Sequence, residues 1–271
     1  MRDDNPDFIE ALGRGLDVIR SLGSVQRPLT LTELSGMTGL ARPTVRRILI
    51  TLETLGYVRS FGDVSAQFGL TPRVLELGTS YVQSHRLWEM VEPHLHSLVA
   101  DINESSSIAE LDGSDVVYVA RVAVPKLVTL SVNIGTRFPA YATSLGKVLL
   151  SGLDDEAALA IRHDPGRSGI IPIWQPTDDE FIAELRQVRA RGWAMTDQQL
   201  APAIRSVAAP VRNGAGQVVA AINVNTHAVE TNEERLLEEI LPKVLQVASD
   251  ISADFQAMEQ LPLSYVTPSV E

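Results

Sequence analysis

Arginine side chains with the chemistry of a nucleic-acid contact gather within residues 27–73. This stretch holds six Arg against three acidic residues, so it is locally cationic although the whole chain has a net charge of −11. Guanidinium groups bind phosphates and the guanine edge in the major groove of DNA. The candidate DNA contacts are Arg42, Pro43, Thr44, Arg46, Arg47 and Arg59.

Two short helices joined by a tight turn must position these side chains. The first is expected at residues 31–38, with Thr30 or Thr32 as N-cap and Gly39 as the left-handed residue that ends it. The second is expected at residues 41–55, with Pro43 in its first turn and Gly56 after its last. Two such helices are the skeleton of a DNA-reading motif.

The apolar residues of the second helix recur at spacings of three and four, which predicts one buried stripe. The stripe is Val45, Ile48, Leu49, Leu52 and Leu55. Arg46 and Arg47 then point away from the core. Two strands follow, at residues 57–60 and 66–70, and predict a hairpin wing. A simpler interpretation, in which the arginines only keep a small helical domain soluble, stays open.

A second set of polar residues predicts a small-molecule site. Asn223 and Asn225 alternate on an otherwise apolar strand, so both side chains point to the same face of a sheet and need polar partners. The segment around Ser144 opens a helix, whose free N–H groups and dipole suit a carboxylate. An acid with one charged end and an apolar body fits both, although the two asparagines could instead bond neighbouring strands in a closed core.

The remaining pattern predicts two domains, an N-terminal all-α winged helix-turn-helix and a C-terminal α+β domain with an antiparallel sheet. The predicted divisions are residues 1–70, a helical linker at 71–88, the second domain at 89–258 and a flexible tail at 259–271. In the first domain, residues 8–22 predict a helix that packs on the core, with Asp7 as its cap. Residues 127–132 predict a strand, and residues 231–258 a single final helix.

Composition excludes several classes of function. The chain has no Cys, so thiolate metal sites and cysteine nucleophiles are absent, and there is no Gly-x-Ser-x-Gly motif. His94 and His96 are two apart on a predicted helix and hence on different faces, so a shared metal is not expected. The sequence therefore predicts no enzyme, no metal and no cofactor. The N-terminus is acidic and polar, and no apolar run reaches bilayer length, so a cytoplasmic protein without a membrane partner is expected.

Several segments of the sequence resemble the IclR family of bacterial transcriptional regulators, from about Phe8 to about Met258. They include ARPTVRRILITLETLGYVRS, LTPRVLELG, IGTRFPAYATSLGKVLL, RGWAMTDQQ and RSVAAPVRNGAGQVVAAINVNTHA. The last three are most similar to the PcaR/PcaU/PobR-like branch, which controls catabolism of protocatechuate and related aromatic acids. The resemblance implies a GAF-like effector domain, a homodimer that is often a dimer of dimers, and a palindromic double-stranded operator.

The resemblance also places an effector pocket between the sheet and the loop that enters the GKVLL helix. The residues that match its lining are Leu127, Leu130, Phe138, Ser144, Leu145, Thr196, Ser206, Asn223 and Asn225. Arg137 binds the effector carboxylate or only a nearby acidic residue, and both interpretations stay open.

The effector implied by the branch is protocatechuate, 4-hydroxybenzoate or β-ketoadipate. The regulator itself is expected to act as a repressor or an activator. The chain departs from the branch at Gln199 and at Pro202-Ala203, and only Lys126 remains of a basic pair. A glyoxylate- or pyruvate-like carboxylate is therefore an alternative effector. A GAF-like enzyme and a dimerisation module without a ligand are the alternatives from other classes of protein.

Overall fold

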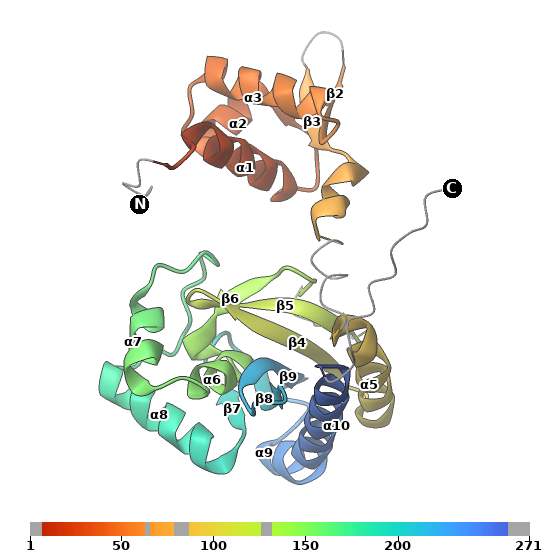
Figure 1. Cartoon of the computed structure of the whole chain (residues 1–271), viewed down its shortest axis with the longest axis vertical. Coiled ribbons are helices and arrows are strands. Elements are labelled where there is room, and N and C mark those ends of the chain that lie inside the picture. The colour runs from red at the N-terminus through yellow and green to blue at the C-terminus, as the bar shows by residue number, and fades with distance from the viewer. Residues whose placement is uncertain (1–6, 63–65, 79–86, 126–131, 260–271) are drawn as a thin grey trace. The chain divides into compact units, whose positions relative to one another are not determined.

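The computed structural model describes residues 7–62, 66–78, 87–125 and 132–259. The chain divides into two compact units, Met1–Ser84 and His85–Glu271. Figure 1 shows a helical unit with a small sheet and a larger unit with one sheet between helices. The predicted fold class, a winged helix-turn-helix domain and an α+β domain with an antiparallel sheet, is confirmed.

The described part of the N-terminal unit contains α-helices, a three-stranded antiparallel sheet of order β1-β3-β2 and, after β3, a 3-10 helical turn at Pro72–Val74. Its elements are α1 (Glu10–Gly23), β1 (Leu29–Thr30), α2 (Leu31–Thr38), α3 (Arg42–Thr54), β2 (Val58–Phe61) and β3 (Gln67–Leu70). The sequence predicted the wing hairpin but not β1, whose two residues pair with Phe68 and Gln67 of β3. Strand β1 thus attaches the wing to the start of α2.

Helix α2 begins with a capping box. Thr30 accepts a hydrogen bond from the Glu33 N–H at 3.3 Å, and the Glu33 carboxylate accepts one from the Thr30 N–H at 2.8 Å. Hydrogen bonds from Arg27 and then from Thr30 hold the pKa of Glu33 down at about 2. Gly39 follows with a φ of 67°, as the predicted left-handed residue requires.

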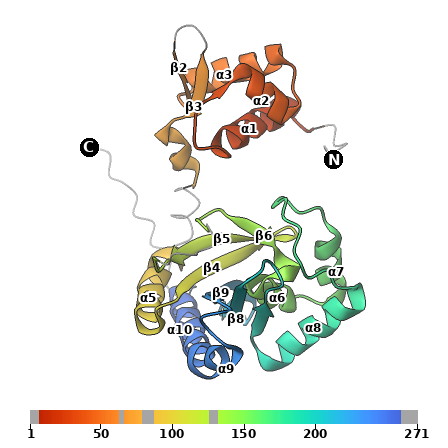
Figure 2. The ribbon, with the colours of Figure 1, turned by 180° about the vertical axis from the view of Figure 1, so that it is seen from behind.

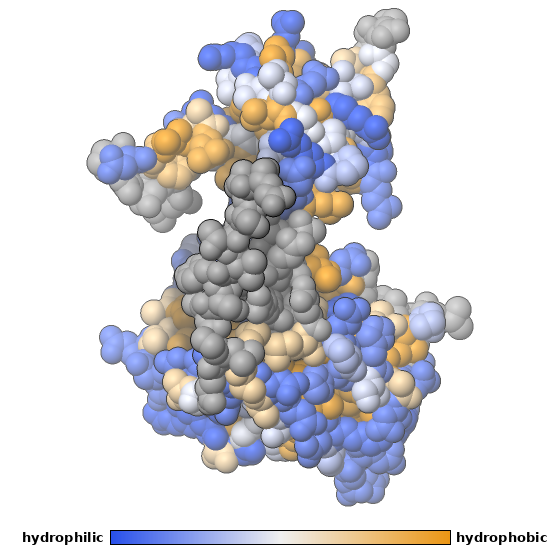
Figure 3. Space-filling view, turned by 45° about the vertical axis from the view of Figure 1, so that its right-hand side comes forward, coloured by the Kyte–Doolittle hydropathy of each residue, from blue (hydrophilic) through white to orange (hydrophobic). Residues whose placement is uncertain are grey.

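The prediction for α1 was partly wrong. Ile9 rather than Asp7 occupies the N-cap position, and the side chains of Leu12 and Leu16 are exposed. Only the C-terminal half of α1 contacts the core of the unit, through Val18 and Leu22. In Figure 3 apolar and polar side chains alternate over the surface of this unit.

The C-terminal unit is built on a six-stranded antiparallel sheet of order β6-β5-β4-β9-β8-β7. The strands are β4 (Ser105–Asp112), β5 (Asp115–Val122), β6 (Arg137–Pro139), β7 (Ala194–Asp197), β8 (Ile204–Arg212) and β9 (Val218–His227). Helices α5 (Leu87–Ile102) and α10 (Leu241–Glu259) pack on one face. Helix α6 (Ser144–Ser151) covers the other face, backed by α8 (Asp178–Arg191) and α7 (Asp155–His163), as Figures 1 and 2 show.

Two details of this unit were not predicted. The short strand β6 extends the sheet beyond β5, and a three-residue run is too short to show a periodicity. The final helix is interrupted, with α9 at Glu233–Arg235 and a π-helical turn at Leu236–Ile240 before α10. Most of the strand predicted at residues 127–132, and the predicted tail except for Glu259, lie outside the described residues.

Candidate functional site

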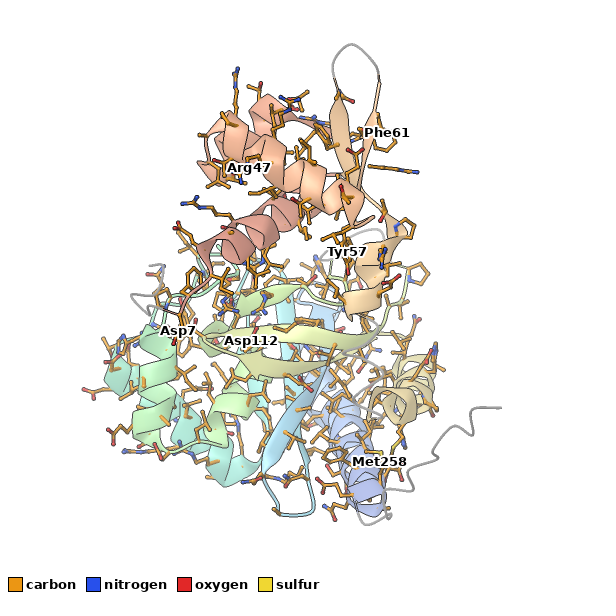
Figure 4. The ribbon with its side chains drawn as sticks, turned by 45° about the horizontal axis from the view of Figure 1, so that its top comes forward. Asp7, Arg47, Tyr57, Phe61, Asp112 and Met258 are labelled. Carbon is orange, nitrogen blue, oxygen red and sulfur yellow. The ribbon has the colours of Figure 1, made fainter. Side chains whose placement is uncertain are left out.

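The outer face of α3 presents the predicted arginines to solvent. Val45, Leu49 and Leu52 are buried in the core of the N-terminal unit, so Arg46 and Arg47 are exposed on the opposite side of the helix. Figure 4 labels Arg47 on this helix. Arg42 and Pro43 are also exposed, and Thr44 is half-buried. Within the described part of the chain, these arginines form no ion pair, so their guanidinium groups are available to a ligand.

Leu55 is an exception to the predicted buried stripe. It lies after the end of α3 and is exposed, with Leu12 and Leu16 of α1 in the same groove. The groove runs between α1 and α3 and has a volume of about 500 Å³. The prediction failed at Leu55 because α3 ends at Thr54, and the side chain of the next residue lies in the groove and not in the core.

Arg59 lies on the wing, separate from the α3 row. Its guanidinium group stacks on the Phe61 ring at 4.8 Å from the centroid, and both side chains are on β2 (Figure 4 labels Phe61). Glu53 of α3 accepts hydrogen bonds from the N–H and the hydroxyl of Ser60 at 3.1 and 2.7 Å. These bonds fix the wing against the helix that carries the other arginines.

The second predicted site coincides with a small cavity between α6 and the sheet. Its volume is about 20 Å³, room for a single water molecule and far below the range of drug-sized ligand sites. An organic acid therefore requires the lining to move apart. The lining residues are Tyr118, Phe138, Ala142, Thr143, Ser144, Thr196, Leu200, Ile204, Ser206, Asn223 and Asn225.

A connected polar network forms one wall of this cavity. Asn223 donates from Nδ2 to Ser206 Oγ at 3.2 Å and to Asn225 Oδ1 at 3.0 Å. Ser206 Oγ lies 2.7 Å from Ser144 Oγ and donates to the Val224 carbonyl at 3.0 Å. The network joins strands β8 and β9 to the first residue of α6.

Helix α6 starts at the cavity because its first turn is fixed by two residues. Thr143 caps the helix by accepting from the Gly146 N–H at 3.0 Å. A Cβ at Gly146 would lie only 2.0 Å from the Ala140 carbonyl oxygen, so the close approach of the preceding turn requires glycine. The N–H groups in the first turn of a helix have no intrahelical acceptor, and here they begin at Ser144 beside the cavity.

Tyr118 lines the cavity and was missed from the sequence. It is 3% exposed and packs edge-on against Phe138, with ring centroids 5.7 Å apart. Burial raises the pKa of Tyr118 to about 12, opposed by hydrogen bonds with Asn225 and Asn223 and by the charge of Arg121. The available signal was a lone tyrosine in an apolar strand, because a buried hydroxyl needs a polar partner.

Four residues predicted for the pocket are not in its described lining. Leu145 is fully buried in the hydrophobic core, one position past the helix start. Arg137 forms an ion pair with Asp112, which lowers the pKa of Asp112, so an effector role for Arg137 stays a prediction. Leu127 and Leu130 lie outside the described residues.

Lys147 is a buried cation on α6 that does not line the cavity. Its side chain is 0% exposed, its Nζ lies 3.1 Å from Glu184 Oε1, and the Trp174 ring centroid is 4.2 Å away. Burial lowers the pKa of Lys147, and Glu184 opposes that shift. This ion pair joins α6 to α8, so the charge of Lys147 is already paired within the protein.

The described residues hold neither a cluster of metal-ligating side chains nor a helix of bilayer length. None of their His, Asp and Glu side chains form a group of three that could hold a metal ion. No helix in that part of the chain is long and apolar enough to span a bilayer.

An exposed arginine row on a winged helix-turn-helix unit, with a polar cavity in a separate α+β unit, defines a two-domain transcriptional regulator. The chain belongs to the IclR family: residues 79–253 match the bacterial transcriptional regulator IclR C-terminal domain, and residues 11–62 match the IclR helix-turn-helix domain. It is accordingly a regulator and not an enzyme.

Individual relatives agree with this assignment. The Pca regulon regulatory protein of Pseudomonas putida is 37% identical over 251 residues, covering 91% of this chain and 84% of the relative. The crystal structure of a candidate transcriptional regulator from Rhodococcus sp. RHA1 is 42% identical with a TM-score of 0.78, covering 93% and 100% of the two chains. The inducer-binding domain of PobR from Acinetobacter, a double mutant in complex with 3-hydroxybenzoic acid, is 28% identical with a TM-score of 0.56, covering 61% and 97%.

Proposed function

We propose that the chain binds double-stranded operator DNA through α3 and the wing, and that a small aromatic acid in the α6 cavity controls this binding. The observation that carries the proposal is the row of exposed arginines on α3, which have no ion-pair partner among the described residues. Arg42, Arg46 and Arg47 are suited to phosphate and base contacts in a major groove, and Arg59 would contact DNA from the wing.

The chemistry of the cavity supports an acid as the effector. The N–H groups at the start of α6 would bind the carboxylate, and Phe138, Leu200 and Ile204 would contact the apolar body. The relatives named for the Pca regulon and the PobR complex with 3-hydroxybenzoic acid favour an aromatic acid. Protocatechuate, 4-hydroxybenzoate and β-ketoadipate are the first compounds to test.

A second candidate effector is a glyoxylate- or pyruvate-like carboxylate. The small volume of the cavity, about 20 Å³, favours it, because a smaller acid requires less movement of the lining. A calorimetric titration with pyruvate and 4-hydroxybenzoate separates the two candidates.

We further propose a homodimer, with a dimer of dimers as the larger assembly, on a palindromic operator. The apolar groove between α1 and α3 supports self-association through the N-terminal unit, because Leu12, Leu16 and Leu55 are exposed there. Leu12→Asp should lower the mass measured by sedimentation, whereas Ile171→Asp in the other unit, at an even more exposed apolar residue, should not. An unchanged mass for Leu12→Asp would place the dimer contact elsewhere.

Gel-shift titration of DNA from upstream of the regulator's own gene tests the DNA-binding proposal. Arg46→Ala and Arg47→Ala should each weaken binding by roughly 10-fold at fixed salt, the order expected for one lost charged contact. Arg20→Ala, at an exposed arginine on α1, is the matched control and should leave affinity unchanged. Wild-type affinity in both α3 variants would rule out this face of the helix.

A further inference from the structure

We infer that Ile50 of α3 contacts the 5-methyl groups of thymines in the major groove of the operator, so that the regulator selects A·T base pairs at this point of its site. The inference rests on the proposed function, because it assumes that the outer face of α3 binds DNA. It adds an apolar, specificity-determining contact to a surface whose proposed contacts are chiefly charged.

Ile50 lies in the middle of the outward face of α3. It follows Arg46 by four residues and Arg47 by three, and it precedes Thr54 by four, spacings that place side chains on one face of a helix. The Ile50 side chain is 53% exposed, whereas the buried side chains of α3 point to the core. An apolar side chain therefore lies directly beside the two arginines that would hold the helix in a groove.

Neither the core nor the groove of the N-terminal unit accounts for Ile50. Among the described residues, it does not belong to the hydrophobic core cluster, against which Ile48 packs. It also does not line the groove between α1 and α3, where Leu12, Leu16 and Leu55 are exposed. The surface proposed for self-association thus leaves Ile50 uncovered. Exposed apolar surface of this kind contributes to binding when a ligand removes it from water.

The polar groups next to Ile50 are bonded within the protein. Thr54 donates its hydroxyl proton to the Ile50 carbonyl at 2.8 Å, so its methyl group is the part left for a ligand. A carboxylate in the major groove would favour cytosine, but Glu53 accepts hydrogen bonds from Ser60 of the wing. This part of α3 therefore presents methyl groups, and thymine is the base that carries an apolar group in the major groove.

Gel-shift titration of the DNA upstream of the regulator's own gene, prepared with either thymine or uracil at every thymine position, tests this inference. Uracil pairs as thymine does and lacks only the 5-methyl group. Wild type should bind the uracil DNA roughly 10-fold more weakly, because each of two copies on a palindromic site loses a methyl contact that contributes roughly 4-fold. Ile50→Ala should bind the thymine DNA roughly 10-fold more weakly than wild type. Its further loss on the uracil DNA should be less than about 3-fold.

Met37→Ala is the matched control, because Met37 is 47% exposed but lies on α2. It should keep the wild-type ratio of affinities for the two DNAs. Because Ile50 is exposed, Ile50→Ala should also keep the wild-type midpoint of unfolding and the wild-type mass in sedimentation. These two measurements separate a lost DNA contact from misfolding and from lost self-association.

Equal binding of the two DNAs by wild type would overturn the inference while leaving DNA binding in place, and this comparison needs no variant. A wild-type ratio in Ile50→Ala would also overturn it, since other residues would then read the methyl groups. A lower mass for Ile50→Ala would instead assign the side chain to a contact between copies. If wild type bound neither DNA more tightly than an unrelated fragment, the proposed operator binding would itself be wrong.

Discussion

At the scale of single residues, the cavity shows what a sequence can and cannot reveal. The alternation of Asn223 and Asn225 predicted a shared polar face, and both residues line the cavity. Tyr118 was missed because its place in the cavity depends on β5 and β9 both pairing with β4, one on each side. That pairing is a long-range property of the sheet. For Arg137 the sequence left open an effector carboxylate or a nearby acidic residue, and the fold places Asp112 beside it, while an effector contact stays a prediction.

Because the pKa of Tyr118 is raised, the free energy of unfolding should fall at alkaline pH. Its pKa is about 12 when folded against 10.0 for an ordinary tyrosine, so its contribution is fully present below pH 10 and is lost as the pH rises towards 12. Urea unfolding should show wild type losing roughly 2 kcal/mol more than Tyr118→Phe between pH 9 and 11.5. Equal losses in the two proteins would show that the phenol ionises as readily in the folded chain as in the unfolded chain.

At the scale of elements, local signals predicted the ends of α2 and α3 because capping acts within a few residues. Thr30→Ala should lower the stability of the N-terminal unit by about 1 kcal/mol in a denaturant titration, since it removes the acceptor for the Glu33 N–H. Thr54→Ala is the control, because the Thr54 hydroxyl bonds back to the Ile50 carbonyl of the same helix. It should change stability by a few tenths of about 1 kcal/mol. The exposure of half of α1 could not be predicted, because an apolar helical face does not specify which partner covers it.

The connection between β7 and β8 carries backbone strain that a substitution can measure. Ala203 has a φ of 63°, in the left-handed region that favours glycine. Ala203→Gly should raise the unfolding free energy by up to about 1 kcal/mol, because relief of strain exceeds the added entropy of the unfolded chain. Ala208→Gly in the buried part of β8 should instead destabilise the unit. A loss of stability in Ala203→Gly would contradict the assignment of strain.

At the scale of the whole molecule, the distribution of charge matters more than its total. Residues 1–85 hold nine Arg and nine acidic residues, so the entire net charge of −11 lies in the remainder of the chain. The proposed DNA-binding surface thus depends on a few local arginines, and operator affinity should fall steeply with salt. A plot of log affinity against log salt should have a slope shallower by about 1 for Arg47→Ala than for wild type.

The most direct test of the account is operator affinity, measured by gel shift, with and without a saturating hydroxybenzoate. Wild-type affinity should change by at least about 5-fold, in either direction, as coupling between two sites requires. Asn223→Leu, which fills the cavity and removes the polar wall, should bind the operator as wild type does without the acid and should show no response to it. An operator affinity that stays constant while the acid is bound, or a full response in Asn223→Leu, would contradict control of DNA binding from this cavity.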